Sequence, residues 1–93
     1  DQAVNLLKQA LIQQGSLTDA DGHVEGVDGN RQYEVISVIS ENDIYYYLLS
    51  ETFMSADGIS QKTGNLYAVC ITTGESFEAV QNMIGTYDLH KLQ

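Results

Sequence analysis

The sequence contains no proline and no tryptophan, a single cysteine, and only four lysine and arginine residues. Without proline, we expect glycine, asparagine and aspartate to make the turns. The one cysteine, Cys70, excludes an internal disulfide and any zinc or iron–sulfur site built from several cysteines. It lies in the apolar stretch NLYAVCITT, where we expect it to be a small buried side chain.

Basic residues are scarce beside the 13 acidic ones, and the formal charge is −9. This charge repels nucleic-acid phosphates and anionic lipid, so neither is an expected partner, whereas cations or a basic protein are favoured. No apolar run approaches the roughly 20 residues that cross a bilayer. The first ten residues lack the basic start and the continuous apolar stretch of a secretory signal. Because the chain begins at Asp1, we expect a processed product or an excised domain.

Ninety-three residues are enough for one domain, which we expect to span 1–93. The first 15 residues show the three-and-four spacing of an amphipathic helix. Asp1 can cap the start of this helix, and Gly15 can end it. The apolar positions that carry the pattern are Ala3, Val4, Leu7, Ala10 and Leu11.

After the helix the apolar period changes to two, which indicates strands. The stretches RQYEVISVIS and IYYYLLSETFM predict a hairpin closed by the three-residue loop Glu41–Asp43, and NLYAVCITT predicts a third strand after the loop SADGISQKTG. HVEGV is a candidate short strand. SFEAV and TYDLHKL fit strands with a turn near Gly85, although ESFEAVQNMI could instead form a helix. The predicted fold is therefore α+β, with one N-terminal helix packed on an antiparallel sheet of four to six strands.

The stretch LTDADGHVEGVDGN partly matches a calcium-binding loop. With Gly22 at the sixth position, Asp19, Asp21 and Asp28 take the third, fifth and twelfth positions. The first position is then Leu17, which cannot ligate, and a strand pattern follows where a second helix is required. We therefore interpret the stretch as two glycine turns and predict no metal and no cofactor.

No catalytic motif is present. The sequence has no GxSxG, HExxH, phosphate-binding or dinucleotide-binding pattern. The two histidines, His23 and His90, are far apart, and Cys70 is flanked by the apolar Val69 and Ile71. We expect no enzyme activity and assign no catalytic residues.

The predicted second strand has apolar side chains on both faces, because alternate residues point to opposite sides. In the expected hairpin, Val38 pairs with Tyr46 on one face, and on the other face Val35 pairs with Leu49 and Tyr33 with Glu51. One helix covers one face, so the other must be covered by the C-terminal segment, by a second copy or by a partner. Tyrosine side chains favour the last two, and the tyrosine-bearing face is therefore expected to be open to a partner. The candidate partner-binding residues are Tyr33, Tyr45, Tyr47 and Glu51. The alternative is that these tyrosines only rim the core.

A helix, a YEV-type strand, and a strand that ends in Thr72-Thr73-Gly74-Glu75 together resemble PepSY-type domains. Cys70 stands where the pattern of that family has an aspartate. The resemblance implies a non-catalytic interaction or regulatory domain of an exported bacterial lipoprotein or surface protein, with an extracellular or envelope location. The alternatives are a self-association domain that forms a homodimer through its tyrosine face, and a small-ligand-binding domain with a cavity between helix and sheet.

Overall fold

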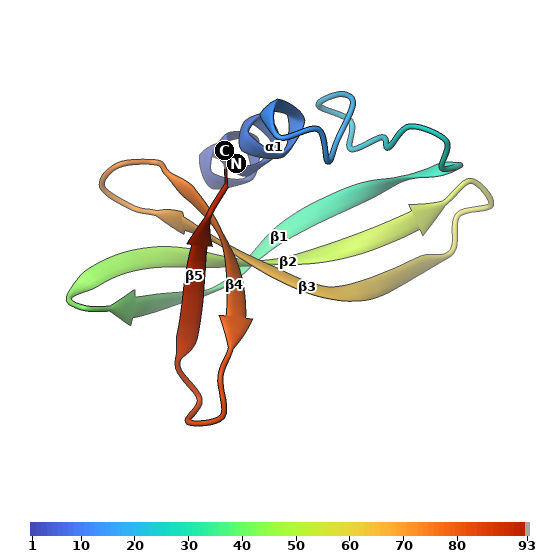
Figure 1. Cartoon of the computed structure of the whole chain (residues 1–93). Helices are drawn as coiled ribbons and strands as arrows, with labels where there is room; N and C mark the ends of the chain where they lie inside the picture. Colours follow the sequence, from blue (N-terminus) through green and yellow to red (C-terminus); the bar gives the residue numbers. More distant parts are fainter. Residues whose placement is uncertain (93) are drawn as a thin grey trace.

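The computed structural model describes residues 1–92 and places one helix on a five-stranded sheet (Figure 1). The sheet is antiparallel throughout, and its strands are ordered as they occur in the chain. This arrangement confirms the predicted α+β fold. The elements are α1 (Gln2–Gln13), β1 (Gly29–Glu41), β2 (Ile44–Ser55), β3 (Ser60–Cys70), β4 (Ser76–Gln81) and β5 (Tyr87–Lys91).

Helix α1 begins and ends where its sequence indicates. The carboxylate of Asp1 accepts a hydrogen bond from the Ala3 amide at 2.9 Å, which satisfies one of the free amides of the first turn. Gly15 has a φ of 87° just beyond the helix, a left-handed conformation that glycine adopts without strain. The predicted apolar face is turned to the sheet, and its buried members are Ala3, Leu7 and Leu11.

The β1–β2 hairpin has a tighter turn than the predicted three-residue loop. Asn42 and Asp43 alone form it, with φ values of 54° and 66°, as in the two-residue turns whose twist matches that of paired strands. Near the turn, Tyr46 therefore lies opposite Ile39, and the prediction that it lies opposite Val38 is wrong. A bulge between Val35 and Ser37 shifts the register back. The predicted pairs of Val35 with Leu49 and of Tyr33 with Glu51 are consequently confirmed.

Three further segments test the predicted strands. HVEGV is not a strand, because the Val27 amide bonds to the Val24 carbonyl in a turn and only His23 forms an isolated bridge, to Asn30. The loop after β2 ends earlier than predicted, since β3 already begins at Ser60. The C-terminal segment forms the two strands β4 and β5 and not the alternative helix.

The sheet curls so that its C-terminal hairpin covers the face opposite the helix. In Figure 1 the β4–β5 hairpin crosses β1–β3 steeply and projects away from α1. The Tyr87 amide of β5 donates to the Glu41 carboxylate of β1 at 3.3 Å, and the Tyr46 and Phe77 rings meet edge to face at 5.5 Å. Two cores result. The helix-side core lies under α1, and the hairpin-side core contains Tyr46, Leu48, Ala68, Cys70 and Ala79.

Candidate functional site

The four predicted partner-binding residues do share one face, but it is the face that carries the helix. Tyr33 is 9% exposed and Glu51 is 2% exposed, so the prediction that they lie on an open surface is wrong. The reason is that the β4–β5 hairpin covers the other face, and α1 is left to lie on the tyrosine face. Tyr45 and Tyr47 are 60% and 36% exposed, and their predicted role in binding stays a prediction.

Glu51 is the centre of a buried polar cluster that joins three strands. Its carboxylate accepts from the Tyr33 hydroxyl of β1 at 2.6 Å, and from the Thr63 hydroxyl and the Asn65 amide of β3 at 2.8 and 2.9 Å. The Arg31 Nε lies 3.8 Å from the same carboxylate. A buried charge is tolerated when such donors surround it. Because donors from β1 and β3 bind the same carboxylate of β2, the cluster links these three strands.

The cluster perturbs its two tyrosines. Burial and the hydrogen bond to the Glu51 carboxylate raise the pKa of Tyr33 far above its ordinary value. Burial, followed by the Glu51 charge, raises the pKa of Tyr67 to about 12. The two rings meet edge to face at 5.8 Å. Both groups are therefore neutral hydrogen-bonding and packing elements, and neither is prepared for proton transfer near neutral pH.

A patch of exposed apolar side chains lies beyond the start of α1, on the helix side of the sheet. We call Val38, Tyr45, Tyr47 and Ile71 the tyrosine surface. Val38 lies directly opposite Tyr47 in the β1–β2 pair, and the Ile71 amide bonds to the Tyr45 carbonyl. The sequence analysis placed Val38 on the other face. Strand alternation does not show how many residues close a turn, and the two-residue turn shifts the pairing by one position.

A cleft of about 460 Å³ adjoins the tyrosine surface between the first turn of α1 and the loop that links β3 to β4. Leu6, Val35, Tyr47 and Val69 are among the apolar residues that line it, and Asp1 is its only charged lining residue within 1–92. Gly74 closes one side. A Cβ built there would lie 3.4 Å from a methyl group of Leu6, so the loop packs closely against the helix. Polar groups, Thr72 and Thr73 among them, also line the cleft, and its apolar side chains continue into the tyrosine surface.

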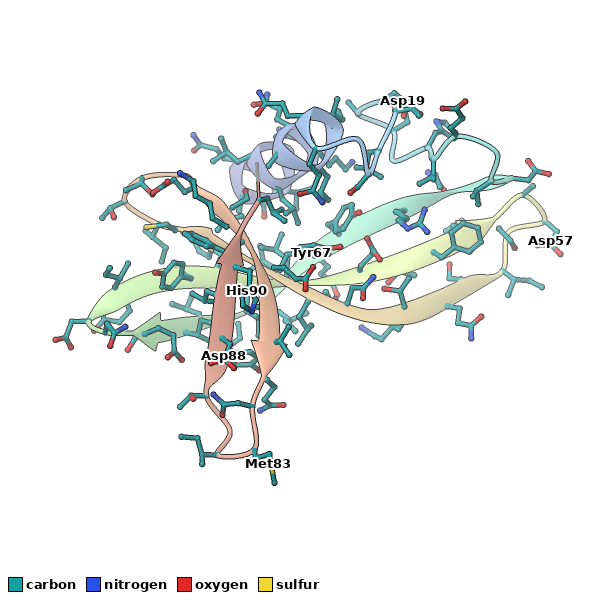
Figure 2. The ribbon with its side chains drawn as sticks, viewed as in Figure 1. Asp19, Asp57, Tyr67, Met83, Asp88 and His90 are labelled. Atoms are coloured by element: carbon teal, nitrogen blue, oxygen red, sulfur yellow. The ribbon has the colours of Figure 1, made fainter. Side chains whose placement is uncertain are left out.

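The acidic loop, for which no metal was predicted, contains a group that could ligate one, and this group differs from the set of the calcium-loop pattern. Asp19, Asp21 and His23 place one ligand atom each within 4.8 Å of one another, whereas Asp28 is not part of the group. The Asp19 carboxylate already accepts from the amides of His23 and Asp21 at 3.2 and 3.0 Å and lies 2.9 Å from the His23 ring. These hydrogen bonds lower the pKa of Asp19. Through these hydrogen bonds, the Asp19 side chain stabilises the turn of its own loop. Figure 2 shows Asp19 in this loop.

Cys70 is buried, as predicted, in the hairpin-side core. Its Sγ lies 3.4 Å from the Thr72 hydroxyl, and hydrogen bonds with Thr72 and Thr73 lower the pKa of the thiol to about 7. The side chain is only 5% exposed, which restricts access by a substrate or reagent.

The chain matches no family model, no curated protein and no solved structure in comparisons with known proteins. The resemblance to PepSY-type domains therefore stays a prediction. Within residues 1–92, α1 lacks the length and apolar character that a helix needs to span a bilayer.

Proposed function

We propose that this chain is a non-catalytic protein-interaction or regulatory domain that binds an apolar element of its partner in the cleft and on the tyrosine surface. The observation that carries the proposal is the joining of a 460 Å³ cleft to four exposed apolar side chains. These four side chains belong to neither hydrophobic core, so the fold does not depend on their burial.

The chemistry of this region supports binding to protein. Exposed apolar side chains that occur singly are ordinary, but contiguous ones beside a hollow are typical of interaction sites. Tyrosine supplies a large apolar contact and a hydroxyl that tolerates water, so it serves in the free and in the bound state. The segment 32–61 also contains five acidic residues and no lysine, arginine or histidine. This charge selects against acidic partners.

The remaining parts of the proposal rest on the sequence. The resemblance to PepSY-type domains supports an exported bacterial parent protein and an extracellular or envelope location. Self-association through the same region is the alternative function. The coding sequence upstream of residue 1 tests the location: a signal peptide with a lipid-acceptor cysteine supports it, and a long intracellular domain contradicts it.

Selection of a random-peptide phage library on the immobilised protein tests the binding function. We expect enrichment of peptides with bulky apolar residues and affinities in the micromolar range, about −8 kcal/mol. Binding should fall at least about tenfold in Tyr45→Ser/Tyr47→Ser. Ile59→Ser is the matched control, since Ile59 is an exposed apolar residue on the distant β2–β3 turn, and it should bind as the unaltered protein does. Failure to enrich any peptide, or equal binding by the double variant, would contradict the proposal.

A further inference from the structure

Strand β1 forms one edge of the sheet, and its second half is uncovered. β1 pairs only with β2, and the loop before β1 covers the edge near its start, where the Arg31 amide donates to the Gly22 carbonyl at 2.7 Å. Further along, Ile36 and Val38 are 48% and 53% exposed, and Ser37 between them is exposed as well. Because Ser37 and Val38 point to opposite faces, the middle of β1 lacks cover on both sides.

The register shows which main-chain groups of β1 face outward. The Tyr45 carbonyl of β2 accepts from the Ile71 amide, so Tyr45 directs its main-chain groups away from β1. Its partner on β1 is Ser40, whose amide and carbonyl therefore point to the open edge, and alternation gives Val38 the same direction. Among residues 1–92, no main-chain group outside β2 pairs with either residue. The Val38 carbonyl accepts a long hydrogen bond, 3.4 Å, from the Ser37 hydroxyl.

The usual protections of an open edge are largely missing from β1. Folded proteins block such edges with lysine, proline, a bulge or a very short strand. β1 has 13 residues and contains no lysine and no proline. It has one bulge, between Val35 and Ser37, and beyond the bulge its pairing with β2 is regular through Glu41. The segment 37–41 can therefore receive a further strand.

We propose that β1 binds an extended, basic segment of a partner protein, which pairs with Val38 and Ser40 as an added strand. This inference rests on the proposed function and specifies the apolar element that the partner supplies. Val38 belongs to the tyrosine surface, and Val35 of the same strand lines the cleft. Alternate side chains of the added strand therefore lie beside the docking region that the proposed function uses.

The charge around this edge selects a basic partner. The segment 32–61 contains five acidic residues and no basic one, and one of the five, Glu51, is buried among its own donors. Of the others, Glu34, Glu41 and Asp43 belong to β1 or to the turn that follows it. Lysine or arginine on the added strand would meet these carboxylates, so binding should weaken as salt is added. A second copy would instead bring like charges together, against a net charge of −9 on each chain.

Calorimetric titration of the full chain with synthetic peptides tests the proposal. The probe is a short peptide of alternating valine and threonine with lysine at both ends. One control replaces the lysines by glutamate, and a second keeps the lysines but replaces the valines by proline, which cannot add a strand. We expect the lysine peptide to bind with a Kd of about 100 μM or tighter and at least about tenfold more tightly than either control. In its complex, the amides of Val38 and Ser40 should exchange hydrogen at least about tenfold more slowly by NMR.

Variants of the chain place the contact on β1. Ser40→Pro removes an outward amide that β2 does not use and should weaken peptide binding at least about tenfold, whereas the matched control Ser40→Ala should bind as the unaltered protein does. Glu34→Gln/Asp43→Asn should weaken binding and reduce its salt dependence. Glu25→Gln/Glu78→Gln, which removes the same charge from exposed positions outside β1, should do so less. Circular dichroism confirms the folds.

The exchange rates of Val38 and Ser40 separate the outcomes. Unchanged exchange of these amides, or equal binding of the glutamate or proline peptide, overturns the proposal, and so does equal binding by a folded Ser40→Pro variant. Slower exchange of the same amides as the concentration of the chain rises, without peptide, also overturns it, in favour of a second copy. If library peptides bind through Tyr45 and Tyr47 while exchange at Ser40 stays unchanged, this inference fails and the proposed function stands.

Discussion

At the scale of single residues, Glu51 shows how this small sheet tolerates a buried charge. It lies between Ser50 and Thr52 of β2, opposite a bulge of β3 in which residues 63–65 face this single position. The bulge allows one carboxylate to receive donors from both neighbouring strands. The same arrangement leaves the Arg31 Nη1 buried without a hydrogen-bond partner among residues 1–92, although the guanidinium also lies 5.7 Å from the centre of the Phe53 ring, within cation–π range.

Removing the Glu51 carboxylate should be costly, because its donors would remain buried without an acceptor. We expect Glu51→Ala to lower the free energy of unfolding by about 3–5 kcal/mol, and Glu51→Gln, which keeps one acceptor oxygen, by less. Urea denaturation followed by circular dichroism measures both. The control is Glu34→Ala at an exposed β1 position, which should stay within about 0.5 kcal/mol of the unaltered protein. Equal losses at the two positions would show that the cluster is not structurally important.

Tyr33 and Tyr67 should make the fold sensitive to alkaline pH. Their pKa values are raised in the folded chain, to about 12 for Tyr67, from the ordinary value of 10.0. Above pH 10 the unfolded chain therefore releases protons that the folded chain retains, so stability that is complete below pH 10 is lost as pH rises. Near pH 11 the free energy of unfolding should fall by about 1 kcal/mol per pH unit for each tyrosine. Urea midpoints between pH 8 and pH 12 measure this loss.

The variant Tyr33→Phe/Tyr67→Phe should flatten that pH dependence. Its matched control, Tyr45→Phe, alters an exposed ring and should leave the slope unchanged. A slope that persists in the double variant would assign the alkaline loss to other groups.

At the scale of elements, the sequence predicted the type of nearly every segment and missed most of the local register. Helix spacing and strand alternation reflect burial, so they identified α1 and the sheet strands. They do not record how many residues close a turn or where a bulge adds one. The two-residue turn at Asn42 and Asp43 displaced the β1–β2 pairing by one position, and the bulge at Val35–Ser37 reversed the shift.

The choice of face was the larger error for the candidate site. Alternation correctly separated the two faces of β2, but both are apolar, so the pattern does not say which face takes the helix. That outcome depends on the curl of β4 and β5 across the hairpin-side core, a tertiary feature with no local signal.

The loop between α1 and β1 depends on a close approach that glycine permits. The Arg31 amide donates to the Gly22 carbonyl at 2.7 Å, and a Cβ on Gly22 would lie 1.9 Å from the Arg31 oxygen. Gly26 has a similar positive φ, 76° against 88°, but faces open space. Gly26→Ala should cost about 1 kcal/mol from backbone strain alone, and Gly22→Ala about 3 kcal/mol or more. Urea denaturation of the two variants separates backbone strain from the steric clash at Gly22. Equal losses in the free energy of unfolding would contradict the close approach.

At the scale of the whole molecule, β2 carries one set of side chains that stabilises the fold and a second set that is proposed to bind a partner. Leu48 is buried in the hairpin-side core, whereas Tyr45 and Tyr47 extend beyond the helix. Leu48→Ala should therefore lower the free energy of unfolding by about 3 kcal/mol. Tyr45→Ser/Tyr47→Ser should lower it by no more than about 1 kcal/mol. Chemical denaturation compares the two variants, and the reverse order would mean that the tyrosine surface belongs to the core.

The cleft and the tyrosine surface beside the first turn of α1 form the proposed protein-docking site. Two-dimensional amide NMR of the labelled protein, titrated with a peptide selected from the library, locates the bound peptide. We expect the shifted amides to lie around the cleft, at Leu6, Tyr47, Ile71 and Gly74. Shifts that instead centre on the Glu51 cluster or the Asp19 loop, or no shifts at all, would contradict it.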